Sequence, residues 1–124
     1  GTEEELAAAT GTTDVTDGVA AVIDCGVEAL ILKRGGRGST VFRPQQPPAD
    51  VAPFRIEVLN VLGAGDAFAS GFLYGYLQGW PLERAARMGN ATGAIVVTRH
   101  GCANFMPTLD EVTAFVSARG EDAI

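Results

Sequence analysis

An α/β fold is predicted from three observations on the sequence. Short runs of aliphatic or alternating apolar residues, typical of strands, stand among longer segments with helical periodicity. The 124 residues are 47% hydrophobic, so the chain has the material for a core. A chain of this length corresponds to one domain or to part of one.

The first half of the chain is predicted to contain two helices and then a β-hairpin. Thr2 is positioned to cap a helix, and Glu5 three residues later completes a capping box. A second helix is predicted over residues 14–25, where valine and isoleucine recur on one face. The aliphatic run 28–35 and the segment 39–44 are predicted strands, joined by the turn GGRG.

The second half is predicted to begin with a polar, proline-rich connection over residues 45–53. A strand is expected at 54–60, because Phe54, Ile56 and Val58 alternate with polar residues. Three helices follow, over residues 64–78, 81–98 and 107 to about 119. The last of them opens with a second capping box, formed by a threonine and a glutamate three residues later.

Small residues recur every four positions in the first two of these three helices. The two stripes are Ala67, Gly71 and Gly75, and Ala85, Gly89 and Gly93. Side chains four apart share one face of a helix, and glycine inside a helix usually has a packing reason. The stripes therefore predict that the helices approach each other or a neighbouring sheet closely.

Three strands alone leave one sheet edge and much helical surface uncovered. We therefore expect residues 1–124 to be the C-terminal part of a larger α/β domain.

The charge and hydropathy of the chain limit the kinds of partner and location that are expected. The net charge of −6 argues against nucleic acid or an anionic membrane, because both attract basic surfaces. Apolar runs are interrupted well before the ~20 residues that a membrane span needs, and the acidic N-terminus lacks the order of a signal peptide. Cys25 and Cys102 form no metal-ligand spacing, so reduced thiols in a cytoplasmic protein are expected.

The stretch NVLGAGDAF at 60–68 combines a strand–glycine–helix junction with a carboxylate. The first N–H groups of a helix carry partial positive charge, and glycines let a ligand approach them closely, which suits phosphate. Asp66 beside such a cradle suggests a base that takes a proton from an attacking hydroxyl in phosphoryl transfer. From these residues alone, a tight turn with Asp66 stabilising the helix N-terminus explains the pattern equally well.

The longer stretch NVLGAGDAFASGFLYGYL resembles the C-terminal signature of the ribokinase-like (phosphofructokinase B) carbohydrate kinases. LILKRGGRGSTVF is similar to the nucleotide loop and hairpin of that family, and NATGAIVVTRHGCANFMPTLDEV to its adenine-side helix and following loop. The resemblance implies a three-layer α/β/α domain. Residues 1–124 would form its nucleotide-binding and catalytic-base portion, with the N-terminal sugar-binding half and the lid absent.

The resemblance implies an ATP- and Mg²⁺-dependent kinase that acts on a sugar or sugar acid. Asp66 corresponds to the base that deprotonates the sugar hydroxyl. The anion hole for the transferring phosphoryl group corresponds to the amides of Gly63, Ala64 and Gly65.

The resemblance also implies residues that border the nucleotide. Lys33, Gly35 and Gly38 match the nucleotide loop, and Asn90 matches a helix position near the adenosine. Two structural alternatives stay open at this point. Lys33 is equally consistent with a solvated charge at a strand end, and Asn90 with a surface or helix–helix hydrogen bond.

Two positions depart from the family pattern. The family's Asn-x-x-Glu element, tied to magnesium and phosphate, aligns with GTEE, so that Glu4 matches the acid while Gly1 replaces the asparagine. Asn60 stands where many members carry an aspartate that helps to bind a monovalent cation. Asparagine keeps an oxygen ligand and loses the charge, which argues against dependence on a monovalent cation.

Two other functions compete with a sugar kinase: a non-catalytic nucleotide- or anion-binding module, and a structural fragment stable only through association. The kinase interpretation predicts that the isolated chain is inactive, and that it self-associates or pairs with the missing N-terminal half. His100, the only histidine, is expected to pack or to lie at the surface.

Overall fold

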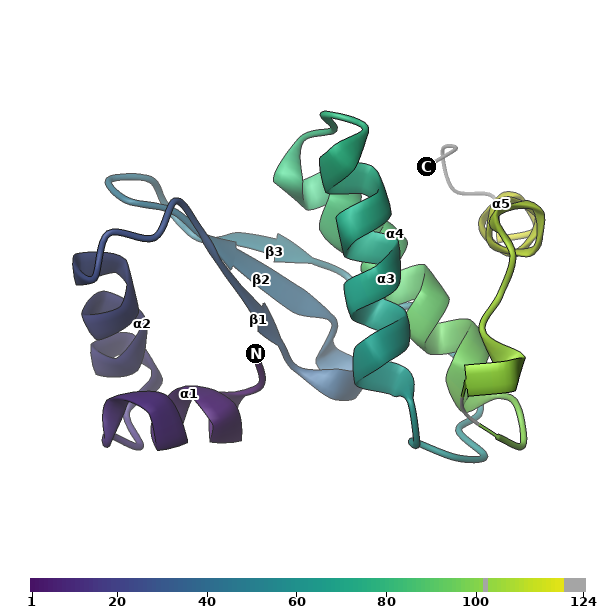
Figure 1. Ribbon diagram of the computed structural model, residues 1–124, viewed down its shortest axis with the longest axis horizontal. Helices are drawn as coiled ribbons and strands as arrows, with labels where there is room; N and C mark the ends of the chain where they lie inside the picture. Colours follow the sequence, from purple (N-terminus) through teal and green to yellow (C-terminus); the bar gives the residue numbers. More distant parts are fainter. Residues whose placement is uncertain (102, 120–124) are drawn as a thin grey trace. The chain divides into compact units, whose positions relative to one another are not determined.

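The computed structural model describes residues 1–101 and 103–119, and the chain divides into two compact units, Gly1–Val51 and Ala52–Ile124. The first unit contains two helices and a three-stranded sheet (Figure 1). Its elements are α1 (Glu3–Thr10), α2 (Val15–Asp24), β1 (Leu30–Lys33), a 3₁₀ turn η1 (Gly35–Arg37), β2 (Ser39–Phe42) and β3 (Ala49–Val51). The capping box predicted for the first helix is confirmed, with hydrogen bonds in both directions between Thr2 and Glu5.

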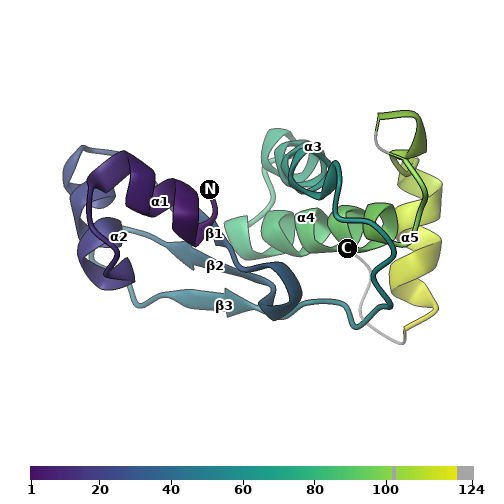
Figure 2. The ribbon, with the colours of Figure 1, turned by 90° about the horizontal axis from the view of Figure 1, so that it is seen from below.

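The sheet has the order β1–β2–β3, and both pairs are antiparallel. Helices α1 and α2 lie along one face of this sheet (Figure 2). Leu32 and Val41 are fully buried on neighbouring strands, and Leu6 of α1 is buried as well. The outer edge of β1 pairs with the N-terminus in parallel, because Lys33 donates its N–H to the carbonyl of Gly1 at 2.7 Å.

The third strand lies earlier in the chain than predicted. Residues 54–60 form no strand, and β3 lies instead within the segment 45–53 that was expected to be a connection. A strand requires a neighbour to share its backbone hydrogen bonds. Residues 49–51 find one in β2, where Thr40 pairs with Asp50 in register.

The segment 54–60 shows why the alternation was misleading. Phe54 is buried and Val58 is exposed, and the N–H groups of Leu59 and Asn60 both donate to the carbonyl of Val97 at the end of a helix. Phe54 and Ile56 therefore pack in or against the helical core, while most of the rest of the segment is exposed and forms no ladder.

The second unit is helical. It contains α3 (Ala64–Leu77), α4 (Leu82–Val97), a 3₁₀ turn η2 (Ala103–Phe105) and α5 (Leu109–Ser117). Its core joins Phe54 to α4 and α5, and its buried members are Phe54, Met88, Ala91, Ala94, Ile95, Val112 and Val116. The capping box predicted for the last helix is confirmed at Thr108 and Glu111.

The predicted close approach of small-residue stripes is confirmed between α3 and α4, which run side by side (Figure 1). A Cβ added at Gly71 would lie 2.5 Å from the hydroxyl of Thr92, and one at Gly89 would lie 2.9 Å from the carbonyl of Phe68. Thr92 also donates to the carbonyl of Ala67 at 2.6 Å, which joins the two helices by a buried hydrogen bond. The glycines are therefore required by the short distance between the helices.

Candidate functional site

The glycine turn before α3 presents unpaired backbone donors. Gly63 is the N-cap of α3 with φ 81°, a left-handed conformation that glycine adopts without strain. Ala64 donates its N–H to the carbonyl of Val61 at 3.2 Å. Within the described part of the chain, the N–H groups of Gly63, Gly65 and Asp66 have no protein acceptor. Three donors at the positive end of a 14-residue helix are therefore available to an anion.

The turn is held in place by its neighbours. The carbonyl of Val97, the last residue of α4, accepts the N–H groups of Leu59 at 2.8 Å and of Asn60 at 3.1 Å. The side-chain oxygen of Asn60 accepts the N–H of Leu62 at 3.0 Å. The oxygen that the sequence offered as a cation ligand thus has a structural hydrogen bond inside the turn.

Asp66 lies in the first turn of α3 and is exposed. Its side chain has no hydrogen bond or ion pair with another described residue, so the carboxylate is not used up in capping the helix. An exposed carboxylate beside unpaired N–H groups can accept a proton from a bound hydroxyl while the amides hold a phosphoryl oxygen. A first-turn carboxylate also stabilises the helix N-terminus without a hydrogen bond, so this arrangement is compatible with both interpretations and the role of Asp66 as a base stays a proposal.

The hairpin loop 34–38 contains the predicted nucleotide-loop residues Gly35 and Gly38, with φ 54° and 85°. This loop closes on itself, because Arg34 donates its N–H to the carbonyl of Gly38 at 2.8 Å and Gly38 donates to Gly35 at 3.0 Å. Lys33 ends β1 just before the loop, with its ammonium 4.0 Å from the carboxylate of Glu5. It is thus paired with α1 rather than freely solvated.

Sequence reasoning missed the acids that hold this loop. One carboxylate oxygen of Glu3 lies 3.4 Å from Nε of Arg34 and 2.9 Å from Nη2 of Arg37. Asp50 of β3 lies 3.8 Å from Nη1 of Arg34 and accepts the hydroxyl of Thr40 at 2.6 Å. The run EEE at 3–5 and the cations of KRGGR at 33–37 were the available signal, because opposite charges on neighbouring segments favour pairing.

Asn90 is buried on α4, and its amide donates to the carbonyl of Ala52 at 3.1 Å. Arg87, one turn earlier, donates to the same carbonyl at 2.6 Å. The structure thus gives Asn90 a hydrogen bond to the chain that enters the second unit, which is neither a surface bond nor a helix–helix bond. A role near the adenosine stays a proposal.

The loop after α4 is fastened to α5. Arg99 donates to the carbonyl of Phe105 at 2.9 Å and to the carboxylate of Glu111 at 2.6 Å. The hydrogen bond from the Thr108 backbone N–H, followed by that from Arg99, holds the pKa of Glu111 below its ordinary value of 4.5. His100 is exposed, as expected, and Cys102 lies outside the described residues.

Glu4 is exposed on α1. Among residues 1–101 and 103–119, no cluster of three or more His, Cys, Asp or Glu side chains is arranged to hold a metal. Mg²⁺ in phosphoryl-transfer sites is commonly held by one or two carboxylates together with substrate phosphates and waters. A single carboxylate at Glu4 therefore fits Mg²⁺ that arrives with a nucleotide. None of the helices within the described ranges is long and apolar enough to cross a membrane.

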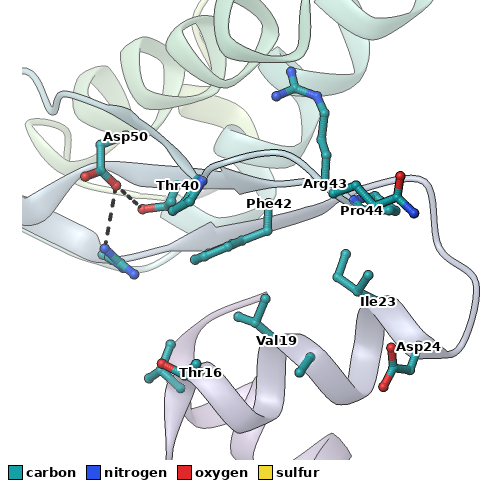
Figure 3. Close-up of a pocket in the computed structure, with 14 residues that line it drawn as sticks. Thr16, Val19, Ile23, Asp24, Thr40, Phe42, Arg43, Pro44 and Asp50 are labelled. Atoms are coloured by element: carbon teal, nitrogen blue, oxygen red, sulfur yellow. Dashed lines mark hydrogen bonds and ion pairs between the residues drawn. The ribbon is translucent and has the colours of Figure 1, made fainter.

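A groove of about 590 Å³ lies in the first unit between α2 and the sheet (Figure 3). Val19 and Ile23 of α2 face Phe42 across it, and the Thr40–Asp50 hydrogen bond lies at one end. None of the predicted site residues lines this groove. Most of the predicted residues lie in two segments, 33–38 in the first unit and 60–66 in the second, whereas Glu4 lies on α1 and Asn90 on α4.

Comparisons with known proteins agree with one another. Residues 1–109 match the model of the pfkB family carbohydrate kinases. The chain is 34% identical over 100 residues to a 5-dehydro-2-deoxygluconokinase of Clostridium beijerinckii, covering 81% of this chain and 30% of that protein. It is 37% identical over 92 residues to the enzyme of the same name from Bacillus anthracis, covering 74% of this chain and 28% of that protein.

Solved structures give the same result. A ribokinase from Thermotoga maritima matches with a TM-score of 0.85 and 26% identity, over 94% of this chain and 40% of that chain. A fructokinase from Vibrio cholerae with bound fructose, ADP and calcium matches with a TM-score of 0.81 and 28% identity, over 92% of this chain and 39% of that chain. The chain thus spans about 30% of the length of the curated relatives and about two-fifths of these structures.

Proposed function

We propose, on the premise that this chain belongs to the pfkB family of carbohydrate kinases, that it carries the nucleotide-facing and base-bearing portion of an ATP-dependent sugar kinase. Residues 1–124 are assigned to the C-terminal portion of such a domain. The sugar-binding portion and any lid are assigned to the part of the relatives' length that this chain does not span. The fragment alone is expected to be inactive, because it lacks the residues that would hold the acceptor.

The observation that carries this proposal is the exposed Asp66 next to unpaired backbone donors. In the proposed reaction Asp66 accepts the proton of a sugar hydroxyl, the oxygen forms a bond to the γ-phosphorus of ATP, and the bond to ADP breaks. The N–H groups of the turn at Gly63, Ala64 and Gly65 hold the charge on the phosphoryl oxygens. Ala64 must give up its 3.2 Å bond to Val61 to take part, whereas the other donors are already available.

The remaining predicted residues are assigned to the nucleotide. Lys33, Gly35 and Gly38 border it from the hairpin loop, and Asn90 positions the helix near the adenosine. When Mg²⁺ is bound it neutralises phosphate charge, and Glu4 is the carboxylate proposed to hold it. Asn60 is proposed to bind no monovalent cation that the reaction needs, because it brings no charge and its oxygen already accepts the N–H of Leu62.

The acceptor is proposed to be a sugar acid of the 5-dehydro-2-deoxygluconate type, phosphorylated during inositol catabolism in the cytoplasm. The names of the relatives at 34–37% identity support this choice. Asp66 is proposed to contact only the reacting hydroxyl, so the identity of the acceptor is inferred from the relatives.

The experiment is complementation. The chain is co-expressed with, or fused to, the remaining part of the Clostridium beijerinckii relative, and ADP release from ATP is followed with the sugar acid as acceptor. Turnover by the pair and none by either part supports the proposal. ATP binding by the chain without turnover by the pair would instead indicate a nucleotide-binding module, and absence of both would indicate a structural fragment.

A further inference from the structure

The loop 34–38 is fixed at both ends by one carboxylate. Arg34 precedes the 3₁₀ turn η1 and Arg37 is its last residue, and the same oxygen of Glu3 lies 3.4 Å from Arg34 and 2.9 Å from Arg37. The two glycines with positive φ, Gly35 and Gly38, stand between and beside these arginines. The distance from Glu3 to each arginine therefore limits how far the ends of the loop can separate.

Arg34 depends on Glu3 more than on its other partner. The side chains of Arg34 and Glu3 are 24% and 33% exposed, whereas that of Asp50 is 82% exposed and lies farther away, at 3.8 Å. The Nε atom of Arg34 is buried and has no hydrogen-bond acceptor, so its charge is balanced mainly by the nearby Glu3 carboxylate. Removing one member of a partly buried pair leaves the other charge uncompensated, which costs more than breaking a fully exposed pair.

Glu4 is a matched control for Glu3, because it is an acid of the same helical turn without the contacts to the arginines. It lies beside Glu3 in the first turn of α1 and has no ion pair with another described residue. Both acids interact similarly with the helix dipole, because both lie in the first turn. An effect on the loop that is specific to Glu3 must therefore come from its contacts with the two arginines.

We infer that Glu3 is a positioning residue for the loop 34–38, and that it raises nucleotide affinity through Arg34 and Arg37 without touching the nucleotide. The inference depends on the proposed function, which assigns this loop to the nucleotide. It adds a residue that the family resemblance did not point to, since the resemblance singled out Glu4. The link between Glu3 and the loop itself stands on the distances alone.

The first measurement uses the chain without nucleotide or metal. Amide hydrogen exchange of Arg34 and Gly38 reports loop opening, because both N–H groups donate within the loop. Glu3→Gln is expected to raise their exchange rates about two- to fivefold, the range expected for a pair of this exposure. Glu4→Gln, which removes the same charge from the same helical turn, is expected to leave them unchanged.

A double variant tests the route of the effect. With Glu3→Gln already present, adding Arg37→Gln is expected to open the loop little further, because the pair is already broken. Circular dichroism of each variant verifies that α1 and α2 remain folded. Additive effects of the two substitutions would overturn the proposed route through Arg37.

The second measurement is ATP affinity by calorimetry, and the ATP KM in the complemented kinase. Glu3→Gln is expected to lower the ATP affinity and to raise the ATP KM, each about two- to fivefold, with kcat unchanged. Equal loop opening in Glu3→Gln and Glu4→Gln, or loop opening without a change in ATP affinity, would overturn the inference. If the complemented kinase neither binds nor turns over ATP, the proposed function fails and the nucleotide part of this inference fails with it, whereas the exchange experiment still decides the link between Glu3 and the loop.

Discussion

The turn at 61–66 and the hairpin loop at 34–38 both contain glycines with positive φ, yet they offer an anion different things. The turn leaves the N–H groups of Gly63, Gly65 and Asp66 without acceptors, whereas the hairpin loop uses the N–H groups of Arg34, Arg37 and Gly38 internally. The hairpin loop has cations, but its neighbours Glu3 and Asp50 already balance them. The turn at 61–66 thus offers an anion backbone N–H dipoles, whereas charged side chains hold the shape of the hairpin loop at 34–38.

The largest effect is expected at the turn, from Asp66→Asn in the complemented kinase. The amide keeps the shape and removes the proton affinity, so turnover is expected to fall about 10²–10⁴-fold while ATP affinity holds or rises. A bulky residue at Gly65 is expected to weaken phosphate binding instead, because its side chain crowds the donors. Near-normal turnover by Asp66→Asn would show that the carboxylate acts only at the helix N-terminus. Steady-state kinetics with sugar acid and ATP distinguishes these results.

Intermediate effects, on the free energy of unfolding, are expected when alanine replaces a glycine with positive φ in each loop. Gly38 has φ 85° and ψ −138°, a region nearly restricted to glycine, so Gly38→Ala is expected to reduce the free energy of unfolding by about 1–3 kcal/mol. Gly63 has φ 81° and ψ −2°, so Gly63→Ala is expected to cost about 1–2 kcal/mol. Urea denaturation followed by circular dichroism measures both.

Gly36 is the matched control for this pair of substitutions. It lies in the same loop as Gly38, its φ is not in the left-handed region, and an added Cβ meets no atom within 4 Å. Gly36→Ala is therefore expected to change the free energy of unfolding by less than about 0.5 kcal/mol. A cost at Gly36 equal to that at Gly38 would show that the loop, rather than the φ of one glycine, resists substitution.

The smallest effect is expected from pH, and of the two loops compared it concerns the hairpin loop, which Glu5 contacts through Lys33. The backbone N–H of Thr2, followed by the charge of Lys33, holds the pKa of Glu5 below its ordinary value of 4.5. A lowered pKa means that the carboxylate stabilises the folded state above pH 4.5, and that this contribution is lost as pH falls through the folded-state pKa. The protection factor of the Thr2 amide, its exchange rate relative to an unstructured peptide at the same pH, is therefore expected to fall below pH 4.5, whereas the backbone donors of the turn do not titrate.

Glu5→Gln tests that pH effect. The neutral amide oxygen still accepts the N–H of Thr2 and cannot be protonated in this range, so the pH dependence of the Thr2 protection factor is expected to vanish. Glu4→Gln is expected to preserve it. A Thr2 protection factor that is the same at pH 3 and pH 7 in the unmodified chain would contradict the assignment.

Local signals in the sequence predicted the parts of this structure that depend on near neighbours. The capping box at Thr2 and Glu5 needs only residues three apart, and the glycine stripes need only helical periodicity. The predicted ribokinase-like α/β fold is confirmed by the solved structures at TM-scores of 0.81 and 0.85. That prediction depended on long signature stretches rather than on periodicity.

The misses came from the choice between alternative partners, which local patterns do not make. Alternation at 54–60 predicted a strand, but Thr40 of β2 pairs with Asp50 instead, and no alternation rule selects between two candidate partners. The prolines at 47 and 48 favoured a connection there, although an edge strand tolerates a nearby proline. The bridge from Glu3 joins two arginines more than 30 residues away; the charge pattern of the two segments favoured pairing, but only the fold selects Glu3 as the acid that pairs with both.

The hydrogen bonds from Leu59 and Asn60 to Val97 have a consequence for the order of folding. These bonds join the segment before α3 to the end of α4. The residues between them form the α3–α4 pair, two helices adjacent in sequence that pack along their glycines. Helical hairpins have low contact order and form early, before pairings between distant segments. The acceptor at Val97 becomes available only when the last turn of α4 has formed, so the glycine turn before α3 is expected to assemble with this helical pair. The unpaired N–H groups of Gly63, Gly65 and Asp66 would then be in place early in folding, before the strands of the first unit pair.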